Sequence, residues 1–123
     1  MDLGIHGKVA LVTGGNRGIG LASALEMARE GCNLVITGRN EADPAKAEER
    51  IQALGVETLT VAADLEEAGG VDKVVSAAFD WFGHVDILFN NAGHIHSCSA
   101  LGATDEGWAS QTFEAASIRV SVL

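Results

Sequence analysis

The sequence predicts an α/β fold of three layers, α/β/α, around a parallel sheet. Short apolar runs alternate with segments of helical periodicity, which is typical of strands joined by crossover helices. The runs are nearly continuous in apolar character, as expected of strands buried on both faces. Right-handed crossovers would place the strands in the order 3-2-1-4, an incomplete doubly wound sheet. We expect residues 1–123 to form a single domain, with residues 5–93 as its best-defined part.

The first three elements follow one another without a linker. Residues 8–12 are a short β-rich run that stops at a pair of glycines. Residues 19–30 place apolar side chains three and four positions apart, which predicts a helix, and Gly31 ends it. Residues 34–37 are apolar almost throughout and predict the second strand.

The next four elements repeat this alternation. Residues 43–54 begin with an Asp-Pro pair, in which Asp suits the N-cap and Pro the first helical position. Residues 58–62 predict the third strand, and residues 71–82 predict a third helix that ends at a glycine. Residues 85–89 predict a fourth strand, which closes on an Asn-Asn-Ala-Gly segment.

Charge and composition exclude several classes of protein. The chain has 8 Lys and Arg residues against 17 Asp and Glu residues. This excess of negative charge argues against electrostatic binding to nucleic acid or to an anionic membrane. It shows no signal-peptide pattern and no apolar run of membrane-spanning length. Cys32 and Cys98 lack disulfide-scaffold or zinc spacing, so we expect a cytoplasmic protein in which Cys32 is a small buried residue.

Beyond the fourth strand the pattern weakens. Residues 94–102 resemble a loop, residues 105–116 a helix, and residues 117–123 an atypical tail. The outer edge of the fourth strand would be unpaired and partly uncovered at Ile87, Leu88 and Phe89, and such an edge favours self-association. The tail alternates apolar and polar residues, so pairing of the tail with this edge is a further hypothesis.

Two other groupings predict no separate site. His94, His96 and Cys98 alternate, but no fourth ligand is evident, so no metal site is predicted. Aromatic residues gather at the end of the third predicted helix, and we interpret them as anchoring that helix to the sheet. They are Phe79, Trp81 and Phe82.

The segment from Thr13 to Gly20 is the most informative motif. It lies between the first strand and the first helix, where a dinucleotide-binding loop is expected. Gly14 permits a tight turn, Gly18 allows the backbone to approach a pyrophosphate, and Gly20 allows close packing of helix on sheet. The helix N-terminus offers N–H groups and a positive dipole end to phosphates. A tight turn formed for packing alone is the alternative.

On these residues the sequence resembles the short-chain dehydrogenase/reductase family. Four features match in order, over roughly residues 5–110. They are the T-G-x-x-x-G-x-G loop of residues 13–20, Asp64-Leu65, Asn90-Asn91-Ala92-Gly93, and Asp105 with Trp108. The resemblance implies a Rossmann-like fold that binds NAD(P) and an oxidoreductase that transfers hydride between NADP(H) and a carbonyl or alcohol substrate.

The same resemblance implies the cofactor-binding positions. Asp64 would accept a hydrogen bond from the adenine amino group and Leu65 would pack on the ring. Residues after the fourth strand would line the ribose and the approach to the nicotinamide, and the glycine-rich loop would hold the phosphates. These positions are Asn90, Ala92 and Gly93, and Gly14, Asn16, Arg17, Gly18, Ile19 and Gly20. A cap at Asp64 and a simple turn at the Asn-Asn pair are the alternatives.

The end of the second strand favours NADP over NAD. NAD-binding proteins usually carry an acidic residue there to hold the ribose 2′-OH. Here a glycine occupies that position and Arg39 follows it. An arginine pairs well with a 2′-phosphate, and Arg17 is a second candidate for the same anion. A solvated surface arginine is the simpler alternative.

The chain lacks the parts that the family uses for proton transfer. By resemblance these are a Tyr, a Lys four residues later, a Ser and an Asn, yet the sequence contains no Tyr and its last Lys is Lys73. The Asn would fall near Ala115 or Ala116. We therefore interpret the chain as the N-terminal half of such an enzyme, through truncation, a changed reading frame or alternative splicing. It is expected to bind the dinucleotide without turnover; a non-catalytic dinucleotide-binding or protein-interaction module is the alternative.

Overall fold

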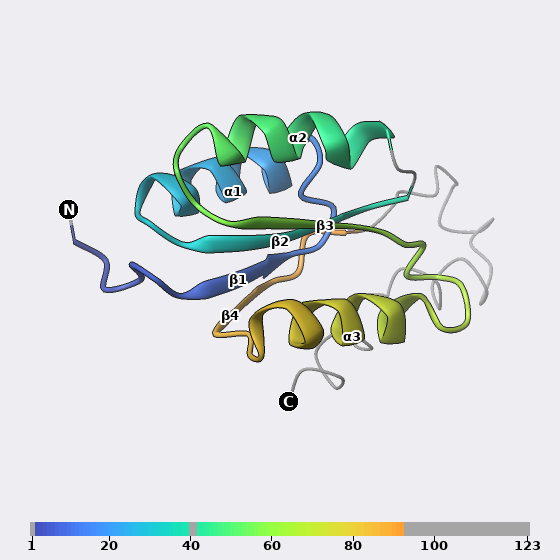
Figure 1. Cartoon of the computed structure of the whole chain (residues 1–123). Coiled ribbons are helices and arrows are strands. Elements are labelled where there is room, and N and C mark those ends of the chain that lie inside the picture. Colours follow the sequence, from blue (N-terminus) through green and yellow to red (C-terminus); the bar gives the residue numbers. More distant parts are fainter. Residues whose placement is uncertain (1, 40–41, 93–123) are drawn as a thin grey trace, which may run out of the picture.

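The computed structural model describes residues 2–39 and 42–92, in which strands and helices alternate along the chain. The strands are β1 (Val9–Val12), β2 (Asn33–Gly38), β3 (Thr58–Ala62) and β4 (Ile87–Phe89). The helices are α1 (Gly18–Arg29), α2 (Ala42–Gln52) and α3 (Gly70–Phe82). The strands are parallel and lie in the order β3-β2-β1-β4, which confirms the predicted sheet. Helices α1 and α2 cover one face and α3 covers the other (Figure 1).

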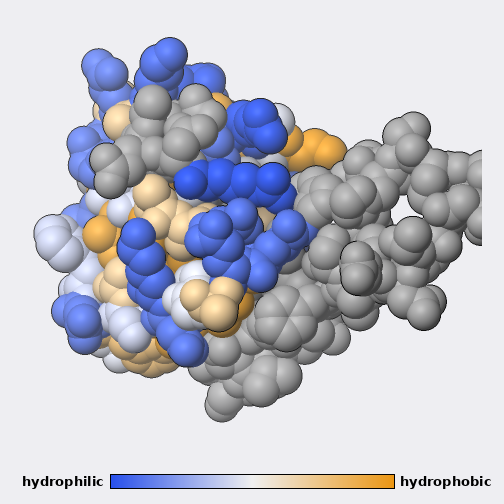
Figure 2. Space-filling view, turned by 90° about the vertical axis from the view of Figure 1, so that its right-hand side faces the viewer, coloured by the Kyte–Doolittle hydropathy of each residue, from blue (hydrophilic) through white to orange (hydrophobic). Residues whose placement is uncertain are grey.

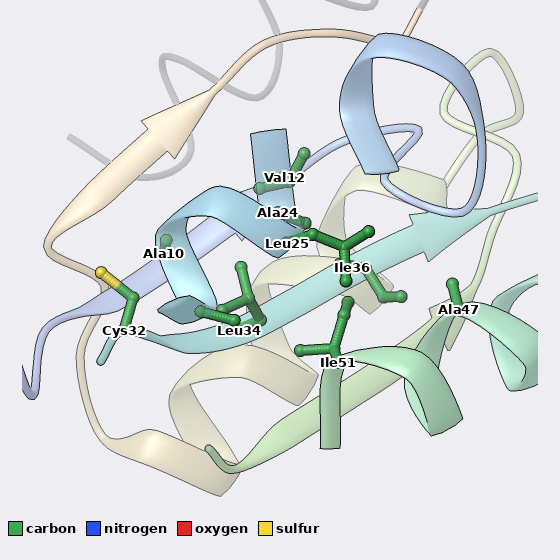
Figure 3. Packing of buried hydrophobic residues seen from close by; sticks show 10 residues of the cluster. Ala10, Val12, Ala24, Leu25, Cys32, Leu34, Ile36, Ala47 and Ile51 are labelled. Atoms are coloured by element: carbon green, nitrogen blue, oxygen red, sulfur yellow. The ribbon is translucent and has the colours of Figure 1, made fainter. Parts of the chain in front are cut away.

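Alternation along the central strands divides the core into two layers. Successive side chains of a strand point to opposite faces, so Ala10 and Val12 of β1 pack under α1 and α2, whereas Leu11 packs toward α3. On β2, Leu34 and Ile36 join the first layer (Figure 3). All five side chains are fully buried. The apolar character of these strands is therefore explained by burial on both faces.

The ends of several elements differ from the predicted ones. Helix α2 begins at Ala42, so Asp43 lies inside the helix instead of capping it. Pro44 is tolerated there because first-turn N–H groups have no acceptor within a helix. Strand β4 has three residues and is shorter than predicted. It lies at one end of the sheet order, and its residues are half-buried.

The interpretation of the aromatic residues on α3 is only partly right. Phe82 packs against the core layer on the α3 side. Trp81, however, is 63% exposed and Phe79 is 40% exposed. The inward stripe of the helix is formed by Val71, Val74 and Ala78, and neither of these two rings belongs to its buried part. They therefore contribute less to anchoring the helix than the sequence suggested.

The predictions for Gly93 and for residues 94–123 lie outside the described residues. They include the loop, the helix and the pairing of the tail, and they stay predictions, as does self-association through the edge of β4. Within the described residues, no helix has the length and apolar character that a membrane span requires. The same residues contain no cluster of metal-ligating side chains.

Two hydrogen bonds outside the strand pairing join β4 to β1 at the amino end of the sheet. Asp86 donates its backbone N–H to the Val9 carbonyl at 2.9 Å, and the Val9 N–H donates to Asp86 Oδ2 at 2.8 Å. His84 Nε2 lies 3.0 Å from the same carboxylate oxygen. The Val9 hydrogen bond is the main reason that the pKa of Asp86 is lowered, and the charges of His84 and Lys8 lower it further. The two hydrogen bonds between Val9 and Asp86 thus fix the point at which β4 enters the sheet.

We expect Asp86→Asn to destabilise the chain at neutral pH and to have less effect in acid. A carboxyl group whose pKa is lowered by folding stabilises the folded chain above its unfolded pKa of about 3.9. This stabilisation is lost as the pH falls through the lower folded-state pKa. Urea unfolding of both proteins at several pH values measures the difference. A difference in free energy of unfolding that does not change with pH would contradict the prediction.

Candidate functional site

The carboxyl ends of the four strands meet at one edge of the sheet, where the sequence placed the candidate site (Figure 1). Ligands of open parallel sheets bind at this edge, next to the point where the strand order reverses. Here that point lies between β1 and β4. Figure 2 looks onto this edge and shows hydrophilic residues gathered around a smaller hydrophobic area.

The glycines of the loop after β1 fall into two groups. A Cβ atom on Gly15 would lie 2.8 Å from Ile36 Cγ2, and one on Gly20 would collide with the Gly14 carbonyl oxygen. These two glycines are therefore required by packing within the protein. Gly18 has a φ of +58° and no atom within 4 Å of the position of a Cβ. It keeps one side of the loop open, as the approach of a phosphate requires.

The N-terminus of α1 lies at the end of this loop. Arg17 occupies the N-cap position with an extended backbone, and its side chain forms no capping hydrogen bond. The first turn contains no acidic residue. Its N–H groups and the positive end of the helix dipole therefore suit an anion. Arg17 and Ile19 are exposed beside it, and Asn16 is half-buried.

The buried Thr13 side chain connects the loop to the end of β4. Its hydroxyl oxygen accepts the backbone N–H of Asn91 at 3.0 Å and that of Ala92 at 2.9 Å. The Asn91 side chain in turn donates Nδ2–H to the Gly14 carbonyl at 3.2 Å. These contacts explain why a threonine precedes the first glycine and why an asparagine follows β4. The set of residues predicted from the sequence omitted both side chains, although the conjunction of the two motifs pointed to them.

The predicted adenine-binding residues follow β3 at the same edge. Asp64 Oδ1 accepts the backbone N–H of Glu66 at 3.0 Å, so one carboxylate oxygen stabilises the local turn. Leu65 is buried in the core layer on the α3 side. Gly70, the first residue of α3, lies so close that a Cβ there would collide with the Asp64 carbonyl. Close packing of α3 therefore determines the position of this turn.

The remaining predicted residues flank the loop. Strand β2 ends with the buried Gly38, and the exposed Arg39 follows it. Asn90 is exposed and Ala92 is half-buried at the end of β4. The topology thus brings the loop, the end of β2, the Asp64 turn and the end of β4 to one edge.

Cys32 contributes no nucleophile to this edge. It is a free cysteine, fully buried as predicted, and it directly precedes β2 at the opposite end of the sheet. Its thiol donates to the Ile5 carbonyl at 3.2 Å. Burial raises the pKa of the thiol, and the charges of Asp86 and Glu30 raise it further. The protonated form is therefore favoured, and a thiol is a weaker nucleophile than a thiolate.

Comparison with known protein families identifies the family of this chain. The model of the short chain dehydrogenase family matches residues 8–116. The chain belongs to this family. The resemblance inferred from the sequence motifs is thus confirmed, and the four-stranded parallel sheet is the Rossmann-like sheet of a short-chain dehydrogenase.

Curated relatives in this family are dehydrogenases and reductases. The 2-dehydro-3-deoxy-D-gluconate 5-dehydrogenase of Escherichia coli (strain K12) is 40% identical over 104 residues, which are 85% of this chain and 40% of the relative. The D-beta-hydroxybutyrate dehydrogenase of Cupriavidus necator is 38% identical over 104 residues, again 85% of this chain and 40% of the relative. The chain therefore spans less than half the length of these relatives.

Solved structures of the family show the same arrangement. L-Sorbose reductase from Gluconobacter frateurii, complexed with NADPH and L-sorbose, has a TM-score of 0.90 and 38% identity, over 99% of this chain and 47% of that chain. An NAD⁺-bound xylitol dehydrogenase has a TM-score of 0.86 and 31% identity, over 96% of this chain and 47% of that chain.

Proposed function

We propose that this short-chain dehydrogenase chain supplies the dinucleotide-binding part of an oxidoreductase that moves hydride between NADP(H) and a carbonyl or alcohol substrate. The observation that carries the proposal is the N-terminus of α1, where the Arg17 side chain forms no cap and the backbone is open at Gly18. A pyrophosphate fits this arrangement by charge and by space. The nicotinamide ring of a bound dinucleotide supplies or accepts the hydride.

Each part of the edge has a role in this proposal. The loop from Gly14 to Gly20 binds the pyrophosphate, with Asn16, Arg17 and Ile19 around it. The Asp64-Leu65 turn receives the adenine. The segment after β4, which contains Asn90 and Ala92, lies along the ribose and the path to the nicotinamide, because the Thr13 hydroxyl holds the backbone of this segment against the loop. The chain's own residues thus bind and orient the dinucleotide.

The end of β2 supports NADP as the preferred cofactor. An aspartate or glutamate at Gly38 would repel a 2′-phosphate, and none is present. Arg39 and Arg17 are both exposed at the edge where that phosphate would lie. The solved relatives include an NADPH complex and an NAD⁺ complex. We therefore base the preference on these residues of the chain.

Arg39→Ala is expected to weaken NADPH binding by about tenfold or more, since charge-assisted hydrogen bonds contribute roughly 1.5–3 kcal/mol. The affinity for NADH should stay nearly unchanged, because NADH lacks the 2′-phosphate. Fluorescence titration of both cofactors measures the two dissociation constants. Arg50→Ala, at an exposed arginine in the last turn of α2, serves as the control. An equal loss for NADPH and NADH in Arg39→Ala would contradict the NADP preference.

A dinucleotide-binding module without turnover is the second candidate, favoured by the absence of tyrosine from the 123 residues. We expect this polypeptide to bind NADPH but not to oxidise it with a panel of carbonyl compounds, as followed by absorbance. Measurable turnover would show that another residue replaces the phenol.

The free, buried thiol of Cys32 fits a reducing cytoplasm, which we propose as the location of the protein.

A further inference from the structure

One hydrogen bond joins the phosphate loop to the neighbouring strand β2. The backbone N–H of Gly14 donates to Thr37 Oγ1 at 3.1 Å. Thr37 is 2% exposed and lies 23 residues further along the chain. On its other side Gly14 accepts from Asn91 Nδ2 at 3.2 Å. The first turn of the loop is therefore held by β2 through its N–H and by the end of β4 through its carbonyl.

The strand alone does not explain a threonine at this position. Valine has the same shape and suits a buried strand equally well. Thr58, at the start of β3, shows the contrast, since it is also buried but its hydroxyl has no hydrogen-bond partner. Thr37 differs because its hydroxyl accepts a backbone donor. A buried N–H group left without an acceptor costs free energy, so the Thr37 hydroxyl stabilises the loop by accepting the N–H of Gly14.

The Gly14 turn in turn affects the rest of the loop. Gly14 has a φ of +65°, in the region where glycine is readily accommodated, so its own backbone does little to restrain the turn. Its carbonyl oxygen lies directly against Gly20, at the start of α1. A shift of Gly14 therefore displaces the start of α1. Thr37 also directly precedes Gly38 and Arg39, where we place the ribose.

We propose that Thr37 is a positioning residue of the dinucleotide site. Its hydroxyl fixes the Gly14 turn and so sets the N-terminus of α1, which receives the pyrophosphate, at the correct distance from the end of β2, which receives the ribose and its phosphate. This role rests on the proposed function. It lies outside the glycine motif and requires no contact between Thr37 and the ligand.

The test compares variants that remove or keep the hydroxyl. Thr37→Val removes it with little change in shape, Thr37→Ser keeps it, and Thr58→Val removes the hydroxyl that has no partner. Amide hydrogen exchange at Gly14 is measured by NMR in the ligand-free chain. Fluorescence titration then gives the affinity for NADPH, and competition gives that for adenosine 2′-monophosphate, which lacks the pyrophosphate. Thr37→Ala repeats the test if Thr37→Val does not fold.

In Thr37→Val we expect exchange at Gly14 to accelerate and the NADPH dissociation constant to rise about tenfold, as the loss of a buried hydrogen bond predicts. Affinity for adenosine 2′-monophosphate should fall less, because that ligand does not use the α1 N-terminus. Thr37→Ser and Thr58→Val should behave like the wild type in both measurements.

Three results overturn this inference alone. The first is unchanged exchange at Gly14 in Thr37→Val, and the second is unchanged NADPH affinity in that variant beside a wild type that binds. The third is a loss of the same size for both ligands, because the effect would then not act through the pyrophosphate turn. A wild-type chain that binds neither NADPH nor NADH overturns the proposed function, and this inference with it.

Discussion

Gly20→Ala is expected to abolish dinucleotide binding and to lower the free energy of unfolding by about 1–3 kcal/mol, as overpacking of a filled site does. A Cβ at this position would collide with the Gly14 carbonyl oxygen and with Asn91 Nδ2. Those two atoms are hydrogen-bonded to each other. The substitution therefore separates the loop from the end of β4. Urea unfolding followed by circular dichroism measures stability, and NADPH fluorescence measures binding.

Gly18→Ala distinguishes packing from ligand approach at the same loop. No atom lies within 4 Å of its Cβ position, so only the left-handed backbone opposes the change, at a cost of about 1–2 kcal/mol. The new methyl group would occupy the open side of the loop, and NADPH binding should be lost. If Gly18→Ala binds NADPH as well as the wild type does, the phosphate is not held at this side of the loop.

If Gly20→Ala keeps wild-type stability, the close packing of Gly20 against the Gly14 carbonyl is wrong.

Ile36→Ala is the second large effect, with an expected loss of about 2–5 kcal/mol in the free energy of unfolding, the usual range for a fully buried isoleucine. Ile36 is 0% exposed and packs in the layer under α1 and α2 (Figure 3). Its Cγ2 also lies 2.8 Å from the position that a Cβ on Gly15 would take, so the side chain packs directly against the phosphate loop. We therefore expect weaker NADPH binding even at temperatures at which the variant remains folded.

Ile51→Ala is the matched control for this prediction. Ile51 is equally buried in the same layer, but it belongs to α2, and it is not among the nearest neighbours of a Cβ on any glycine of the loop. We expect a similar loss of stability with little change in NADPH affinity among folded molecules. Denaturant unfolding and NADPH titration at low temperature measure both quantities. Equal effects of the two variants on affinity would contradict a specific support of the loop by Ile36.

Local patterns predicted most of the fold. The strands were evident because runs such as 34–37 are apolar on both faces, and the helices because apolar residues recur three and four positions apart. Helix ends were less well defined. The Asp-Pro pair is compatible both with a helix capped by Asp43 and with a helix that begins one residue earlier, at Ala42. The exposure of Trp81 also escaped prediction, because helical spacing does not say how far a neighbouring layer extends.

The candidate site divides in the same way. Gly18 and Arg39 could be assigned from motifs, because backbone freedom and charge are properties of single residues in a local context. Thr37 could not, because its hydroxyl accepts the N–H of Gly14, which lies in the loop after another strand. The same holds for Asp86, whose carboxylate meets Val9 across 77 residues of sequence.

The sequence by itself thus predicted the family, the order of the elements and the edge of the sheet at which the candidate site lies. The family was inferred from the resemblance of its motifs, whereas the order of the elements and the edge follow from periodicity, glycine spacing and the rule that parallel strands are joined by right-handed crossovers. Only the tertiary structure decided which polar side chains hold the loop in place. A hydrogen bond forms between groups that the register of neighbouring strands brings within about 3 Å, and register emerges only when the sheet is assembled.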